Sequence, residues 1–307
     1  MKFDYDVAII GAGAAGFSAG IYCGRAGLSS IVFDSKTAGG LTLTSPEIEN
    51  YPGFPTISGP DLMANIQKHA EKWCTVKELE AVKGLSVNKD SVTITTSEKQ
   101  YRVGAVILCT GVDHDRLNIP GEKEFAGKGV SYCATCDGFF FKEKRTVQVG
   151  GGNTAALEAL YQKGLGVDVS LIHRRDRLKA DDIYKKRIKE AKIPVIFNSI
   201  VKEIHGDTVV RSVTVVDTVT GKAKDMLVEG VFIAVGMKPN NSLAKTIGVE
   251  LTPEGNIKVN GRMETNLRRV YAAGDITGGV RQIVTATAQG AVAALSTLEV
   301  LGKSYPF

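Results

Sequence analysis

The sequence has no long uninterrupted apolar run and no block of like charges. A membrane-spanning helix needs about 18 or more predominantly apolar residues, and no stretch of the 307 residues approaches 18 uninterrupted ones. The first residues lack the charged, apolar and small-residue regions of a secretory signal peptide. The net charge of +5 is small for this length and no basic–aromatic repeat accompanies it. We therefore expect no membrane and no nucleic-acid partner.

Cysteine is scarce, and its pattern excludes a disulfide framework. There are five cysteines, of which only Cys133 and Cys136 are closely spaced. An odd number without regular spacing indicates a cytoplasmic protein in which any disulfide is catalytic. A structural zinc site needs about four ligands, and no second Cys or His pair lies nearby, so no metal is expected. The isolated Cys23, Cys74 and Cys109 are expected to be inert, buried thiols.

Glycine is plentiful, and two glycine-rich motifs reveal an internal duplication. The first block has a strand at residues 7–10, a glycine turn at 11–16, a helix, and a strand at 30–33. The second repeats this order with a strand at 146–149 and a turn at 150–155. Strand, glycine turn, helix and strand form the unit of a dinucleotide-binding fold. The predicted fold class is α/β, with two three-layer, Rossmann-like dinucleotide-binding domains, the second inserted into the first.

The domain boundaries follow from the turn signals between the blocks. A chain of this length is expected to form about two domains, at roughly 150 residues each. Pro120-Gly121 and Pro239-Asn240 mark turns on either side of the second block. The residues after 242 are too few for a third domain. We predict one domain from residues 1–113 and 243–307, and an inserted domain from residues 114–242.

The ends of the second strands distinguish the two predicted nucleotides. Counting 23 residues from Gly11 reaches Asp34, and the same count from Gly150 reaches His173, which Arg174 and Arg175 follow. An acidic residue at this place binds ribose hydroxyls, whereas arginines accept a 2′-phosphate. We therefore predict FAD in the first domain and NADPH in the inserted domain. An alternative is that the basic residues only form an exposed loop.

The pair in Cys133-Ala134-Thr135-Cys136-Asp137-Gly138 lies just before the second block. On a chain with FAD and NADPH sites, the pair is interpreted as redox-active, because reduced flavin can pass two electrons to a disulfide. Asp137 is the nearest candidate to protonate the departing thiolate. It could instead only cap the turn beside Gly138.

Together these motifs resemble the low-molecular-weight thioredoxin reductases of bacteria and archaea. The Cys-Ala-Thr-Cys-Asp-Gly motif is followed by Gly-Gly-Gly-x-x-Ala and His-Arg-Arg-Asp, and the segments 39–42, 47–53, 273–275 and 281–282 add support. The match runs over nearly the whole chain. The resemblance implies FAD, NADPH, a homodimer, and thioredoxin or a thioredoxin-like protein as the oxidant. It also implies that Cys136 faces the flavin, Cys133 attacks the protein substrate, and Asp137 is the acid.

The resemblance and the glycine motifs give two sets of cofactor-binding residues. For FAD they are Gly11, Gly13, Ala14, Gly16, Asp34, Gly39, Gly40, Leu41, Asn50, Thr110, Gly111, Gly274, Asp275, Arg281, Gln282 and Ile283. For NADPH they are Gly150, Gly152, Asn153, Thr154, Ala155, His173, Arg174, Arg175 and Lys179.

Some positions depart from the family's commonest pattern. Gly40 stands where many members have Gln, Lys179 where Arg is usual, and Asn153-Thr154 where Asp-Ser is frequent. Reduced deazaflavin or ferredoxin therefore stays open as an alternative electron donor. A non-enzymatic flavin thiol sensor is a second alternative, although it would not need a second nucleotide site. Larger flavin disulfide reductases are excluded, because residues 41–52 hold no cysteine and the last histidine is His205.

Overall fold

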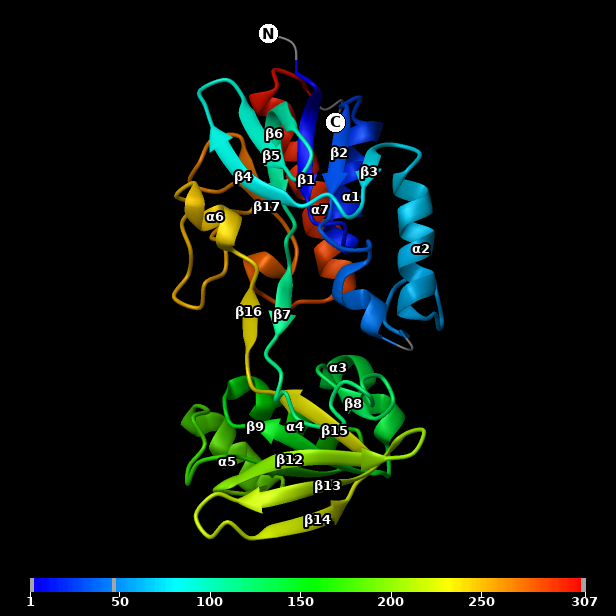
Figure 1. The fold of residues 1–307 in the computed structure, drawn as a ribbon, viewed down its shortest axis with the longest axis vertical. Helices are drawn as coiled ribbons and strands as arrows, with labels where there is room; N and C mark the ends of the chain where they lie inside the picture. Colours follow the sequence, from blue (N-terminus) through cyan, green and yellow to red (C-terminus); the bar gives the residue numbers. More distant parts are fainter. Residues whose placement is uncertain (1–2, 46–47, 305–307) are drawn as a thin grey trace. The chain divides into compact units, whose positions relative to one another are not determined.

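The computed structural model describes residues 3–45 and 48–304, which form two compact units (Figure 1). Unit 1 comprises Met1–Asp113 and Lys238–Phe307, and unit 2 comprises His114–Met237. The two connecting segments form the short strands β7 (Val112–His114) and β16 (Met237–Pro239), which pair with each other.

Unit 1 is built on a largely parallel sheet whose strands lie in the order β3-β2-β1-β6-β5-β4. Strand β6 also pairs in parallel with β17, while β5 and β4 form an antiparallel hairpin beside its first residues. The strands are β1 (Tyr5–Ile10), β2 (Ser30–Phe33), β3 (Thr75–Lys77), β4 (Val82–Val87), β5 (Val92–Thr96), β6 (Gln100–Leu108) and β17 (Val270–Ala272).

The alternation of side chains along β1 places apolar residues on both faces of this sheet. Val7 and Ile9 lie in one core cluster with helices α1 (Ala14–Arg25) and α7 (Ile283–Val300), and Ala8 and Ile10 lie in the other. Small residues let α1 and α7 approach closely: a Cβ on Gly290 would lie 2.1 Å from the carbonyl oxygen of Ala15. Helices α2 (Gly59–Ala70) and α6 (Ser242–Thr246) and the 3₁₀ turns η1 (Gly40–Thr44) and η3 (Asp275–Thr277) complete unit 1.

Helix α7 has 18 residues and a mean hydropathy of 1.3, so by length and composition it could cross a membrane. Its residues Ala293, Ala294 and Leu298 lie instead in the unit 1 core that α1 shares. The Ser18 hydroxyl donates to the carbonyl of Thr287 at 2.7 Å. These contacts make α7 a core helix of unit 1.

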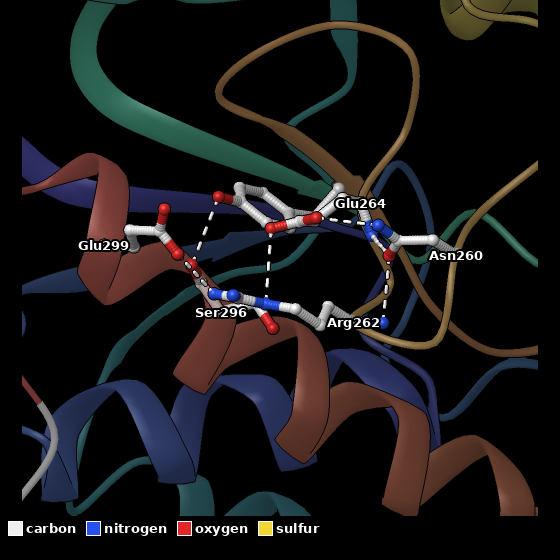
Figure 2. Close-up of polar contacts among 6 residues, drawn as sticks. Asn260, Arg262, Glu264, Ser296 and Glu299 are labelled. Carbon is white, nitrogen blue, oxygen red and sulfur yellow. Dashed lines mark hydrogen bonds and ion pairs between the residues drawn. The ribbon is translucent and has the colours of Figure 1, made fainter.

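A cluster of hydrogen bonds and ion pairs connects the loop before β17 to the last turns of α7 (Figure 2). Arg262 pairs with Glu299 at 2.7 Å and with Glu264 at 3.4 Å. Asn260 donates to Glu264, and the Tyr271 hydroxyl donates to the carbonyl of Ser296 at 3.2 Å. The cluster lies at the C-terminal end of α7, and its partners satisfy one another. We therefore assign it a structural role.

Unit 2 repeats the same architecture on a smaller scale. Its parallel sheet has the strand order β11-β10-β9-β15-β8, and a three-stranded antiparallel sheet, β12-β13-β14, forms a second layer. The strands are β8 (Val130–Ser131), β9 (Arg145–Gly150), β10 (Asp168–Ile172), β11 (Val195–Ile196), β12 (Ser199–Gly206), β13 (Val210–Asp217), β14 (Ala223–Leu227) and β15 (Gly230–Ala234). The helices are α3 (Ala134–Asp137), η2 (Gly138–Phe141), α4 (Asn153–Gly164) and α5 (Asp182–Glu190).

The two faces of this parallel sheet are covered by different layers. Val147 and Val149 of β9 pack with residues of the antiparallel sheet, such as Val213. Val169 and Leu171 of β10 lie in a second cluster that contains residues of α4 and α5. The predicted fold class is confirmed: both units contain the parallel strand–turn–helix–strand motif, and unit 2 is inserted into the chain of unit 1.

Candidate active site

The redox turn of unit 2 comprises Cys133–Cys136, joined by a disulfide with a Cα–Cα distance of 5.3 Å. Cys133 is the N-cap of the one-turn helix α3, and its carbonyl accepts the N–H groups of Cys136 and Asp137 at 3.2 and 3.1 Å. The hydroxyl of Ser131, at the end of β8, accepts the Cys133 N–H at 3.1 Å. The Thr135 hydroxyl lies 3.3 Å from the Cys133 sulfur. The local backbone therefore presents both sulfurs on one short turn.

Asp137 is the carboxyl group on this turn. The Ser131 hydroxyl donates to its Oδ2 at 2.5 Å, while its Oδ1 is buried without a hydrogen-bond partner among the described residues. Burial raises the pKa of Asp137, and the bond from Ser131 partly opposes that shift. A buried carboxyl with an unpaired oxygen favours the protonated form. Asp137 can therefore hold a proton next to the disulfide.

A second ionisable group near the redox turn was not predicted from the sequence. Glu158 of α4 accepts a hydrogen bond from Gln148 of β9 at 3.0 Å. Burial raises the pKa of Glu158 to about 7, although the hydrogen bond from Gln148 acts in the opposite direction. Ser131 was also not predicted.

The first glycine turn connects β1 to α1 in unit 1. Gly11 has φ +110°, and a Cβ there would lie 2.2 Å from the Cys109 carbonyl oxygen, so only glycine fits. A Cβ on Gly16 would lie 1.8 Å from the carbonyl oxygen of Gly11. Gly13 is the N-cap and Ala14 the first residue of α1, whose first turn has no side-chain cap and no acidic residue. Such an N-terminus offers N–H groups to an anion.

Asp34, directly after β2, stabilises this turn through hydrogen bonds. Its carboxylate accepts the Ala12 N–H at 2.8 Å and the Lys36 N–H at 2.9 Å. The Gly39 N–H donates to the carbonyl of Ala12 at 2.8 Å, and Gly39 and Gly40 both have positive φ. Leu41 follows within η1. The predicted residues of segments 11–16, 34 and 39–41 therefore meet around one turn.

Residues near the C-terminus join the predicted residues of the first half of unit 1. The Asn50 amide donates to the Gln282 side chain at 3.2 Å, across 232 positions of sequence. Gln282 is the N-cap of α7, with Thr285 completing a capping box, and Ile283 is the first residue of that helix. Glu47, in the segment that supports the resemblance, lies outside the described residues.

The remaining predicted FAD residues lie in loops of unit 1. The Thr110 hydroxyl donates to the carbonyl of Asn240 at 2.8 Å, and Gly111 has positive φ. Gly274 is the N-cap of η3, which begins at Asp275. The pKa of Asp275 is raised because the carboxyl group is buried, and the positive charge of Arg281 only partly opposes this shift.

The second glycine turn, between β9 and α4, has the same construction as the first. Gly150 has φ +151°, and a Cβ there would lie 2.4 Å from the carbonyl oxygen of Ala234. Gly152 is the N-cap of α4, which again has no side-chain cap and no acidic residue in its first turn. Asn153 exchanges two hydrogen bonds with Asp181, and Ala155 is buried. Thr154 is exposed.

His173 differs from the basic residues that follow it. Its side chain is 7% exposed, and a Cβ on Gly151 would lie 2.1 Å from its Nδ1, so the ring packs beneath the turn. Burial lowers the pKa of His173, which favours the neutral ring. Arg174, Arg175 and Lys179 are exposed, and the backbone N–H of Lys179 donates to the Gly151 carbonyl at 2.7 Å. The loop after β10 therefore brings three cations to the glycine turn.

No group of three or more His, Cys, Asp or Glu side chains that could hold a metal ion occurs within residues 3–45 and 48–304.

Comparison with known proteins gives one consistent family. The sequence pattern of the family described as pyridine nucleotide-disulphide oxidoreductase matches residues 5–290. The thioredoxin reductase of Bacillus subtilis is 42% identical over 295 residues, covering 95% of this chain and 93% of the relative. That of Treponema pallidum is 41% identical over 297 residues, covering 96% of each.

Solved structures agree with these relatives. The crystal structure of thioredoxin reductase from Streptococcus pyogenes superposes with a TM-score of 0.93 at 35% identity, covering 97% of this chain and 98% of that one. Thioredoxin reductase from Giardia duodenalis gives a TM-score of 0.91 at 33% identity, with 97% and 99% covered. The resemblance that the motifs indicated is confirmed, and the chain belongs to the pyridine nucleotide-disulphide oxidoreductase family.

Proposed function

We propose that this chain is a disulfide reductase that transfers electrons from NADPH, through FAD and the Cys133–Cys136 disulfide, to oxidised thioredoxin or a thioredoxin-like protein. The observation that carries the proposal is the disulfide itself. It lies on a one-turn helix beside Asp137, whose buried carboxyl has one unpaired oxygen. The same chain contains two uncapped helices behind glycine turns, as expected for two dinucleotides.

The turn of unit 1 suits FAD. The N-terminus of α1 is open to a pyrophosphate, and Asp34 lies at the strand end where an acidic residue meets ribose hydroxyls. Asn50 and Gln282 hold each other at the start of α7, and both are among the residues that we assign to FAD. When bound, FAD supplies a two-electron relay between a nicotinamide and a disulfide.

The turn of unit 2 suits NADPH. Arg174, Arg175 and Lys179 are exposed cations on the loop that bonds to Gly151, and guanidinium groups bind phosphate in a bidentate manner. We assign them the 2′-phosphate. His173 supports the site because its buried ring packs against Gly151.

The dithiol chemistry follows from the order of groups on the turn. The Cys133 thiolate attacks one sulfur of the substrate disulfide, and a mixed disulfide forms while the other substrate sulfur leaves as a thiolate. Cys136 then attacks the Cys133 sulfur, which closes the Cys133–Cys136 disulfide and releases the second substrate thiolate. Each released thiolate takes up a proton. Asp137, whose pKa is raised by burial, is the carboxyl group on the turn that would supply one of them.

We further propose a cytoplasmic location and a homodimer, as the motif resemblance implies. The free state of Cys23, Cys74 and Cys109 supports a reducing compartment, because the disulfide between Cys133 and Cys136 lies in the catalytic motif. Sedimentation analysis of the purified protein would measure the oligomeric state, and a monomer would contradict the proposed homodimer.

An anaerobic flavin titration tests the proposed function. NADPH should bleach the yellow protein, and oxidised thioredoxin should restore the colour with formation of two thiols per thioredoxin. NADH, reduced deazaflavin and reduced ferredoxin serve as parallel donors. If NADPH fails to bleach the flavin while another donor succeeds, the NADPH assignment is wrong. If no oxidised thioredoxin-like protein restores the colour, the reductase assignment fails.

A further inference from the structure

The hydroxyl of Ser131 bonds to Cys133, at the start of the redox turn, and to Asp137, which follows the turn. Ser131 is the last residue of β8 and is 5% exposed. Its oxygen accepts the N–H of Cys133 at 3.1 Å and donates to Oδ2 of Asp137 at 2.5 Å. One buried hydroxyl therefore contacts both the first cysteine of the pair and the carboxyl group beside the second.

The hydrogen bonds around Ser131 determine where its own hydrogen points. A hydroxyl has one hydrogen to donate. Two acceptors lie near it, Oδ2 of Asp137 at 2.5 Å and the carbonyl oxygen of Cys133 at 3.4 Å. That carbonyl already accepts the N–H groups of Cys136 and Asp137 at 3.2 and 3.1 Å, which occupies both of its lone pairs. The Ser131 hydrogen is therefore donated to Asp137.

This direction decides which oxygen of Asp137 can carry a proton. A proton on Oδ2 would have to be donated to Ser131, and the Ser131 hydrogen would then have only the occupied Cys133 carbonyl to turn to. Oδ1 is buried and has no hydrogen-bond partner among the described residues. When Asp137 is protonated, the proton therefore resides on Oδ1, while Oδ2 accepts from Ser131.

The same hydrogen bond becomes stronger when Asp137 loses its proton. A hydrogen bond to an ionised carboxylate is shorter and stronger than one between neutral groups. Ser131 therefore stabilises the carboxylate that remains after a proton transfer. In agreement with this, its hydrogen bond opposes the rise in the pKa of Asp137 that burial causes.

The backbone that presents Ser131 is fixed through the next residue, Tyr132. The Tyr132 hydroxyl donates to Glu122 at 2.9 Å. Glu122 is 3% exposed and also accepts the backbone N–H groups of residues 117 and 118 at 3.1 and 2.6 Å. Successive side chains of an extended segment point to opposite sides. The anchored Tyr132 therefore leaves the Ser131 side chain directed at Asp137.

We propose that Ser131 is the positioning residue for the acid of the reaction. It occupies Oδ2 of Asp137 and leaves Oδ1 to release the proton. When a thiolate departs, the Oδ1–H bond breaks and a sulfur–hydrogen bond forms on that thiolate. Asp137 remains as a carboxylate that accepts from Ser131, and it recovers its proton from water. This inference rests on the proposed reductase function, because it needs Asp137 as the acid.

Three substitutions separate this role from simple support of the backbone. Ser131→Ala keeps a small side chain but loses the bond to Asp137 and the acceptor for the Cys133 N–H. Asp137→Asn removes the proton donor and leaves the acceptor for Cys133 in place. Ser199→Ala is the matched control, because Ser199 of β12 in the same unit is also 5% exposed and donates to the Phe197 carbonyl at 2.8 Å.

The first measurement is a double-mutant cycle on kcat for thioredoxin reduction. Ser131→Ala alone should lower kcat on the order of tenfold, as expected for losing a hydrogen bond to a charged group. In the Asp137→Asn background the same change should lower kcat by less than about twofold, because the acid that Ser131 positions is already absent. Flavin reduction by NADPH should be unchanged in Ser131→Ala. Ser199→Ala should turn over within about twofold of wild type.

The second measurement is the titration of Asp137 in the oxidised, FAD-containing protein. Carbon-13 NMR of labelled aspartate carboxyl groups follows it, and the missing signal in Asp137→Asn assigns it. Ser131→Ala removes a hydrogen bond that lowers the pKa of Asp137, so this carboxyl group should titrate at a higher pH than in wild type. It should titrate as in wild type in Ser199→Ala. If Asp137→Asn has no measurable turnover, the titration decides alone.

Four results would overturn the proposal. They are an Asp137 titration that Ser131→Ala leaves unchanged or moves to lower pH, wild-type turnover by Ser131→Ala, an equal fold loss from Ser131→Ala in both backgrounds, or a loss of the same size in Ser199→Ala. A wild-type protein that does not reduce thioredoxin would instead refute the proposed function. The titration would still decide whether Ser131 holds the Asp137 carboxyl group.

Discussion

The raised pKa of Glu158 makes a quantitative prediction about folding stability. Burial raises this pKa from its ordinary value of 4.5 to about 7. Between these two values the folded protein binds the proton more tightly than the unfolded chain does. The resulting stabilisation is fully present below pH 4.5 and is lost as the pH rises through 7. At about 1.4 kcal/mol per pKa unit, this amounts to on the order of 3 kcal/mol, and partial exposure of Glu158 reduces it to about 2 kcal/mol.

Glu158→Gln isolates this contribution, because glutamine does not titrate and the other ionisable groups remain. We expect the wild-type free energy of unfolding, minus that of Glu158→Gln, to decrease by about 2 kcal/mol between pH 5 and pH 8. Urea unfolding of both proteins at several pH values would measure the difference. Glu190→Gln, on the exposed surface of α5, should show no such trend. A wild-type-minus-variant difference that stays constant from pH 5 to 8 would refute the assigned burial of Glu158.

Three further predictions concern the proposed redox and NADPH residues. Cys133→Ser and Cys136→Ser should each abolish thioredoxin reduction but leave flavin reduction by NADPH largely intact in stopped-flow measurements; normal turnover by either would eliminate the dithiol mechanism. Replacing both Arg174 and Arg175 with Ala should raise the KM for NADPH on the order of a hundredfold, at about 1.5–3 kcal/mol per charge-assisted bond, with little change for NADH. A retained preference for NADPH would show that the 2′-phosphate lies elsewhere. Gly151→Ala should weaken NADPH binding in calorimetry and destabilise unit 2 by about 1–3 kcal/mol, because the new Cβ would lie 2.1 Å from the buried ring of His173. A variant with wild-type affinity and stability would contradict the packing of His173 against Gly151.

The sequence by itself determined the features that depend on short-range geometry. The first glycine of each turn is specified by a positive φ and a close carbonyl, so spacing alone located Gly11 and Gly150. The same repeat gave the parallel α/β class and the insertion of one unit into the other. The spacing of Cys133 and Cys136 predicted a small disulfide loop, and the structure contains this disulfide on a single helical turn.

Only the tertiary structure decided which distant side chains meet. Asn50 and Gln282 are 232 positions apart, and their contact depends on where α7 begins relative to the loop after β2. The sequence predicted that His173, Arg174, Arg175 and Lys179 surround the 2′-phosphate; in the structure the His173 ring is buried against Gly151, whereas the other three residues are exposed. Glu158 has no motif of its own. Its raised pKa comes from the packing of α4 on β9, which partly buries the carboxyl group and places it within hydrogen-bond distance of Gln148, and local spacing does not encode that packing.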